Sequence, residues 1–184
     1  MKSRTSATAI LAATALAGGL VLAGTAAAGH LNPVLEGDLS GRAEVATDAS
    51  DRRIVGDPNA SGEAYVFGID NDSFAGVVES NADTLCYLVL VDGISELDQN
   101  PGNGRAAHIH RGSEGENGPV VANLAFPTDG QGADCLTEGE DGKGMAPGIV
   151  AEILANPEGF YVNVHNNEFP NGAVRAQLAE SHDH

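Results

Sequence analysis

The segment 84–91 constrains the fold most strongly, because it is a short, almost uninterrupted run of apolar residues. As a β-strand it would present apolar side chains on both faces, which is typical of a central strand covered on both sides. The chain also has 24 Gly and 8 Pro, a composition that predicts many turns and therefore short strands. We predict an all-β fold, a single Greek-key β-sandwich of about seven or eight strands with one short helix.

Turn-forming residues divide the rest of the chain into further short segments. Several of these alternate apolar and polar residues, which is the period of a half-buried strand. The predicted strands are 35–45, 62–69, 74–78, 84–91, 106–110, 119–124, 160–165 and 173–178. The one helix is expected over residues 148–155, where apolar residues follow helical spacing and Asn156-Pro157 ends it. The acidic, glycine-rich segment 125–147 is predicted to be a long loop.

The charge balance excludes two classes of partner. Lys plus Arg number 9 against 26 Asp plus Glu, which gives a formal net charge of −17. Nucleic acid is bound by clustered Lys and Arg, and an anionic membrane surface attracts basic segments, so neither is an expected partner. Because hydrophobic residues make up 42 % of the chain and charged residues only 19 %, the acidity belongs to the surface of a folded domain rather than to a disordered tail.

The first 28 residues have the pattern of a signal peptide. Lys2 and Arg4 form a short basic start, residues 7–24 carry no charge, and Ala26-Ala27-Ala28 supplies the small residues of a cleavage site. We therefore expect cleavage after Ala28, a secreted domain over residues 29–184, and no stable insertion in a membrane after cleavage. The alternative is a retained membrane anchor, for which this stretch is short and lacks a following basic cluster.

Cys86 and Cys135 are the two cysteines of the chain. In the oxidising compartment that a signal peptide implies, two cysteines are expected to form a disulfide. The bond would attach the predicted loop 125–147 to the central strand. Two buried free thiols are the alternative.

The histidines carry the most information about function. His108 and His110 are two residues apart in a predicted strand, so both imidazoles lie on one face and Ile109 lies on the other. In the two last strands the apolar residues face the core, and polar residues alternate with them. The polar residues that this alternation places on the outer face are Tyr161, Asn163 and His165 in 160–165, and Arg175 and Gln177 in 173–178.

If these strands are neighbours, the polar side chains form one patch, with Glu168 at its rim. Three imidazoles can bind Zn²⁺ or Cu²⁺ and leave a coordination position open. We therefore predict that His108, His110 and His165 converge as a candidate copper or zinc site. Arg175 argues against a metal, because a cation beside it is unfavourable unless an anion or Glu168 intervenes. A non-metal ligand or partner surface, and a purely structural hydrogen-bonded cluster, remain alternatives.

Long motifs occur in a fixed order along the chain. They are LSGRAEV at 39–45, DTLCY at 83–87, AHIHRG at 107–112, ENGPVV at 116–121, GFYVNVH at 159–165 and FPNGAVRAQL at 169–178. Together they resemble the CHRD domain, named after chordin, over about residues 35–178. Ala176 departs from the family, which often has Gly at that position. The resemblance implies an extracellular β module whose biochemical role is mostly undefined. Growth-factor binding, which accompanies such modules in chordin-like proteins, is not carried over, because this chain has no cysteine-rich partner modules.

The histidine pattern is also similar in outline to Cu/Zn superoxide dismutase, a secretable β-sandwich with a His-x-His pair and a late histidine. The resemblance is incomplete, because residues 112–136 contain no His and lack the zinc-loop ligands of that family. We therefore expect a secreted, non-catalytic binding or cell-surface module whose extracellular ligand or protein partner is unknown. A copper- or zinc-binding protein is the alternative function, and no catalytic residue is predicted.

Overall fold

The computed structural model describes residues 32–47, 55–69, 82–94 and 106–181. The predicted signal peptide 1–28 and the predicted strand 74–78 lie outside these residues. The described strands are β1 (Val34–Ser40), β2 (Ser61–Ile69), β3 (Thr84–Asp92), β4 (Ala107–Arg111), β5 (Val120–Leu124), β6 (Gln131–Thr137), β7 (Phe160–Val164), β8 (Val174–Gln177) and β9 (Ala179–Glu180). The helices are α1 (Ile149–Ala155) and the 3₁₀ turns η1 (Gly41–Ala43), η2 (Thr128–Gly130) and η3 (Pro157–Gly159).

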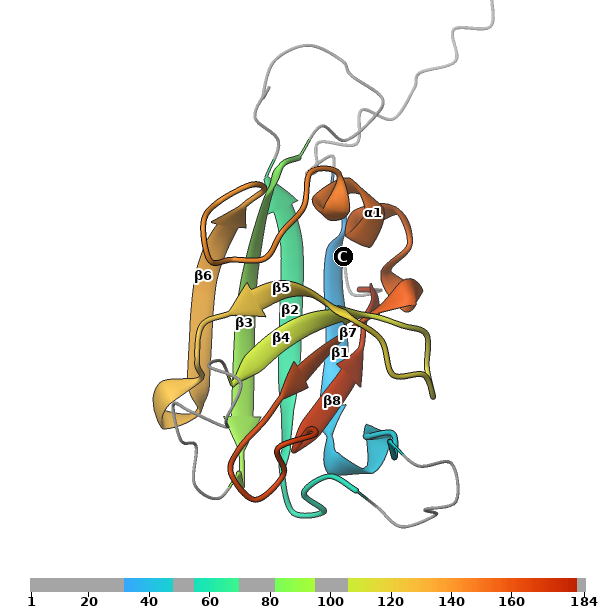
Figure 1. The fold of residues 1–184 in the computed structure, drawn as a ribbon, viewed down its shortest axis with the longest axis vertical. Helices are drawn as coiled ribbons and strands as arrows, with labels where there is room; N and C mark the ends of the chain where they lie inside the picture. Colours follow the sequence, from blue (N-terminus) through green and yellow to red (C-terminus); the bar gives the residue numbers. More distant parts are fainter. Residues whose placement is uncertain (1–31, 48–54, 70–81, 95–105, 182–184) are drawn as a thin grey trace, which may run out of the picture.

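The nine strands form one antiparallel sheet in the order β5-β4-β7-β8-β1-β2-β3-β6, with β9 beside β1. The sheet folds over where β1 meets β8, through the single residue pair Ser40 and Arg175. In Figure 1, strands β4, β5, β7 and β8 therefore cross in front of the upright strands β1, β2, β3 and β6. The result is two facing layers joined along one side, close to a barrel in shape. The all-β prediction is confirmed, and the described residues contain nine strands rather than seven or eight.

The core lies between the two layers and is built from alternate residues of the strands. In β7, Phe160, Val162 and Val164 are buried in it, while the residues between them point to the outer face of the layer. The side chains are mostly aliphatic, in agreement with an aromatic content of only 4 %. Further members from both layers are Leu35, Leu39, Ala64, Val66, Leu85, Tyr87, Val89, Ile109, Val174, Ala176 and Leu178.

Helix α1 packs its apolar side against this core. It lies where the sequence predicts a helix, over residues 148–155. Its buried residues are Ile149, Val150, Ile153 and Leu154. The carboxylate of Glu138 accepts hydrogen bonds from the main-chain N–H groups of Gly148 and Val150, so the first turn has partners for its free donors. Within the described part of the chain, no helix is long and apolar enough to cross a membrane.

Strand β6 corrects the predicted loop over residues 125–147. It is the last strand of its layer and pairs with β3. Of its residues only Gly132 and Leu136 are buried, so the apolar alternation that identifies a strand is almost absent from the sequence. An edge strand needs few apolar residues, and exposed polar ones protect it from pairing with another chain.

The predicted disulfide is confirmed, and β6 explains how it forms. Cys86 on β3 lies directly opposite Cys135 on β6, with a Cα–Cα distance of 4.0 Å and a sequence separation of 49 residues. The bond therefore connects two paired strands, not a strand and a loop as the sequence suggested. It fastens the edge strand to the centre of its layer.

Removal of the disulfide is expected to destabilise the fold, because the unfolded chain gains conformational entropy when the link is absent. Opening a loop that spans 49 residues of sequence should lower the free energy of unfolding by roughly 3–4 kcal/mol. Urea unfolding of the oxidised protein and of the double variant Cys86→Ala/Cys135→Ala measures the difference. Equal free energies of unfolding, or two titratable thiols in the unfolded and unreduced protein, would contradict this expectation.

Candidate functional site

Three adjacent strands bring the predicted polar residues to one surface. Strand β7 lies between β4 and β8, and the register places Asn163 opposite His108 on one side and Arg175 on the other. The next outward-facing row is His110, Tyr161 and Gln177. His165 follows directly after β7, and its main-chain N–H donates to the carbonyl of Ala106. The polar patch thus forms on the outer face of this layer, as the strand alternation predicts.

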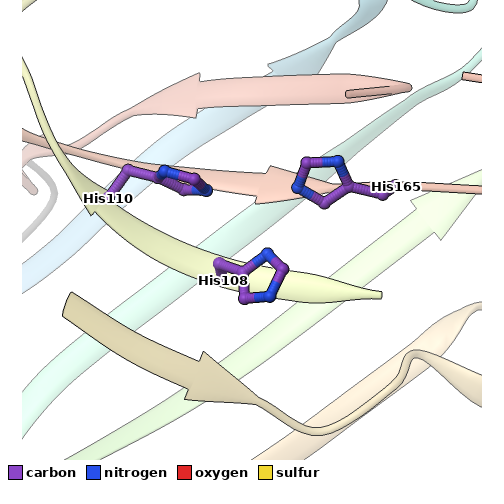
Figure 2. Close-up of side chains that lie close together, drawn as sticks. All are labelled: His108, His110 and His165. Atoms are coloured by element: carbon purple, nitrogen blue, oxygen red, sulfur yellow. The ribbon is translucent and has the colours of Figure 1, made fainter. Parts of the chain in front are cut away.

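The three histidines converge within this patch. One nitrogen from each ring can be chosen so that all three lie within 4.8 Å of one another. The ring centroid of His108 is 5.5 Å from that of His110 and 5.1 Å from that of His165. Figure 2 shows His108 and His110 on β4, and His165 just beyond the end of the neighbouring strand. The expected convergence is therefore present, and the metal-ligand role of these residues remains a prediction.

Two segments cover the patch, which makes it far less exposed than an outer sheet face usually is. The first is the cover loop, residues 112–119 between β4 and β5, and the second is residues 44–47 after η1. Asn117 of the cover loop donates to the carbonyl of Val45, which joins the two segments. Under them His165 is only 5 % exposed and Asn163 only 3 %. His108 and His165 therefore lie beneath the surface, and His110 is half-buried.

Main-chain carbonyls fix the protonation pattern of two of the imidazoles. Nδ1 of His110 lies 2.9 Å from the carbonyl oxygen of Gly118, and Nδ1 of His165 lies 3.1 Å from that of Pro170. A carbonyl only accepts hydrogen bonds, so Nδ1 carries the proton in both neutral rings. Nε2 then keeps its lone pair. Both Nε2 atoms are buried and have no hydrogen-bond partner among the described residues.

Burial keeps both of these rings neutral. Burial, together with the neighbouring His110, lowers the pKa of His165 to about 4, against the opposing effect of the Pro170 carbonyl. The pKa of His110 is also lowered, mainly by burial, with a smaller contribution from Arg175 and an opposing one from the Gly118 carbonyl. At neutral pH both imidazoles therefore have a lone pair available, which is the form that binds a metal ion.

Arg175 is the buried cation of the patch, 2 % exposed, and its terminal nitrogens are occupied. Nη1 donates to the carbonyl of Glu116 at 2.7 Å, and Nη2 donates to that of Ser113 at 2.9 Å and to Oε1 of Gln177 at 3.2 Å. The guanidinium carbon lies 3.5 Å from the centre of the Tyr161 ring. Arg175 thus holds the cover loop in place, and those nitrogens do not point at the histidines as free donors.

Tyr161 and Gln177 also hold the cover loop against the sheet. The Tyr161 ring is parallel to that of His110, at 4.8 Å between centroids, and its hydroxyl accepts from the main-chain N–H of Gly118. Gln177 donates to the carbonyls of Gly112, Glu158 and Phe160. Glu168, predicted at the rim, has an exposed side chain in the turn between β7 and β8. A ligand-binding role for any of them remains untested.

Glu44 belongs to the site, although the sequence analysis did not select it. Its Oε2 accepts from Nδ2 of Asn163 at 3.3 Å, and its Oε1 is buried without a hydrogen-bond partner in the described part of the chain. Burial raises the pKa of Glu44 to about 8, although Arg175 and the hydrogen bond from Asn163 both lower it. No spacing signal links Glu44 to residues so distant in sequence, so only the fold reveals it.

Comparison with known proteins places the chain in a family. A family model described as CHRD domain matches residues 35–178, and this range contains every residue of the patch. No curated protein and no solved structure matches the chain in the corresponding comparisons. The similarity in outline to superoxide dismutase therefore still rests on the sequence alone.

The buried imidazole of His165 is expected to make the stability of the metal-free protein depend on pH. Its native pKa of about 4 lies below the ordinary 6.5, so between these values the unfolded chain binds more protons. The native state therefore loses stability as the pH falls through this window, by roughly 3 kcal/mol in total. His165→Asn retains an N–H donor for the Pro170 carbonyl and lacks the titrating ring.

Denaturant unfolding of both proteins in EDTA, from pH 7 to pH 4, measures the effect. The free energy of unfolding of the wild type, relative to the variant, should fall by about 3 kcal/mol across this range. A difference that stays constant with pH would show that the native and unfolded states bind this proton equally well.

Proposed function

The chain belongs to the CHRD domain family, and on that premise we propose that it is an extracellular, non-catalytic module that binds one transition-metal ion. The ligands are His108, His110 and His165, and the ion is zinc or copper. Imidazole nitrogen is a preferred ligand of both metals. His108 and His110 of β4 and His165, which directly follows β7, would surround such an ion on one side.

The observation that carries this proposal is the pair of buried Nε2 atoms on His110 and His165. Each lacks a hydrogen-bond partner in the described residues, and leaving a buried acceptor unsatisfied costs about 1–3 kcal/mol. In both rings the opposite nitrogen donates to a main-chain carbonyl. This is the arrangement that orients metal-ligating histidines in proteins, because it fixes the ring and directs the lone pair at the ion.

The atoms without partners favour a cation over an anion. Besides the two imidazole nitrogens, they include Oδ1 of Asn163 and Oε1 of Glu44. The two imidazole nitrogens and the amide oxygen offer only lone pairs, and none of these three is a donor that an anion would need. The terminal nitrogens of Arg175 are already bonded to carbonyl oxygens and to Gln177. These nitrogens are therefore not free to bind an anion.

Two further features support an extracellular, non-catalytic role. The disulfide between Cys86 and Cys135 is the kind of bond that persists in oxidising compartments, in agreement with a signal peptide over residues 1–28. The cover loop and residues 44–47 also enclose the histidines, which suits retention of an ion better than turnover of a substrate. A bound ion would stabilise the native fold in proportion to its affinity.

The test is metal binding by untagged protein, first stripped with EDTA and then titrated with Zn²⁺ or Cu²⁺ by calorimetry. The wild type should bind about one ion, and binding should weaken as the pH falls and protons compete for the imidazoles. His110→Asn keeps an N–H donor for the Gly118 carbonyl and removes Nε2. This variant should lose high-affinity binding while its melting temperature in EDTA stays close to that of the wild type.

The matched control is His182→Ala/His184→Ala, which removes two histidines outside the described residues. It should bind the ion as the wild type does. Binding that disappears in this control, or a wild type that binds no metal, would contradict the proposal. A wild type without metal affinity would identify the three histidines as a hydrogen-bonded structural cluster.

A further inference from the structure

We propose that Glu44 is the anionic partner of the bound ion, so that the protein itself supplies the negative charge a dication needs at this site. The inference rests on the proposed function, because it assigns the counter-charge of the same metal centre. It concerns a residue of the segment after η1, far from the histidines in sequence. The Glu44 carboxylate would offset the positive charges of the ion and of Arg175.

The backbone around Glu44 is shaped to admit its carboxyl group. A Cβ atom at Gly172 would collide with both carboxyl oxygens of Glu44, and one at Gly56 would collide with its Cγ. Only glycine leaves room for the side chain at these two points. Glu44 therefore reaches inward between two turns and ends on Asn163, its hydrogen-bond donor.

Asn163 connects the carboxyl group to the histidines. On β7 it lies directly opposite His108 and two residues before His165, and all three side chains point to the same face. Directly opposed residues on adjacent strands have Cβ atoms about 4.5–5.5 Å apart. The Glu44 carboxyl is thus one side chain removed from the cluster, within range of a strong charge interaction in a poorly hydrated layer.

The charges of the site require such a group. With His110 and His165 neutral, a dication beside Arg175 would bring only positive charge into a covered layer, which is unfavourable without a nearby anion. Arg175 of β8 and Asn163 of β7 are the groups that act on Glu44, and both favour its charged form. The side chains of Glu114, Glu116 and Glu168 are exposed, so Glu44 is the better placed carboxylate among these.

Metal binding would then change the protonation of Glu44. Burial raises its pKa to about 8, so the metal-free carboxyl holds its proton at pH 7. A nearby dication favours the carboxylate, and the proton passes to solvent as the ion binds. Glu44 lines a pocket of about 150 Å³ together with Thr47 and Asn171.

The experiment compares Glu44→Gln with Glu116→Gln, titrated with Zn²⁺ and with Cu⁺. Glu116 is the matched control, because it makes the same Glu→Gln change at an exposed carboxylate near Arg175 while the main-chain carbonyl that Arg175 uses remains. Glu44→Gln should weaken Zn²⁺ binding about 10- to 100-fold and weaken Cu⁺ binding less, since a monocation needs less compensation. At pH 7 the wild type should release about one proton per Zn²⁺ from this carboxyl, and Glu44→Gln should release none from it.

Each result decides a separate statement. A wild type without Zn²⁺ affinity overturns the proposed function. A wild type that binds Zn²⁺, with Glu44→Gln equal to it in affinity and in proton release, overturns only the role of Glu44. If Glu44→Gln does not fold, infrared difference spectra of the wild type replace it. The band of a protonated carboxyl should disappear when Zn²⁺ binds, and its persistence would refute the inference.

Discussion

A buried positive charge, the guanidinium of Arg175, is the constraint on which the arrangement of this surface depends. Burying an ion without partners costs several kcal/mol, so its donors must find acceptors nearby. Here the acceptors include the carbonyls of Ser113 and Glu116, and the cover loop has to lie across the sheet to present them. The same loop brings Gly118 to His110 and to the hydroxyl of Tyr161. The cover and the orientation of one imidazole therefore depend on one buried cation.

The covered layer has an asymmetry that supports the proposed binding of a cation. Arg175 and Gln177 use their donors on main-chain carbonyls, whereas the imidazoles of His110 and His165 keep unpaired acceptors. In a region of low dielectric such acceptors are costly alone and interact strongly with a positive ion. Enclosing these acceptors without partners therefore lowers the free energy of unfolding of the metal-free protein. A bound ion would restore that stability.

Much of the site could be predicted from the sequence, because strand geometry decides which side chains share a face. Side chains alternate across a strand, so the positions of His108, His110 and His165 on one face followed from their spacing and from the apolar residues between them. The disulfide followed from the count of two cysteines. Strand β6 did not, because as an edge strand it buries only Gly132 and Leu136 and lacks the pattern of a strand.

By itself the sequence determined the all-β class, the family, the face on which each strand residue lies, and the partner of Cys86. These properties depend on local alternation, on turn residues and on composition, which are present in the linear chain. Only the tertiary structure decided that the outer polar face is covered and that the Nε2 atoms of His110 and His165 are left without partners. It alone placed Glu44 on Asn163, 119 residues away in sequence. Such contacts are formed by loops, whose paths follow from the packing of the whole sheet and not from any local period.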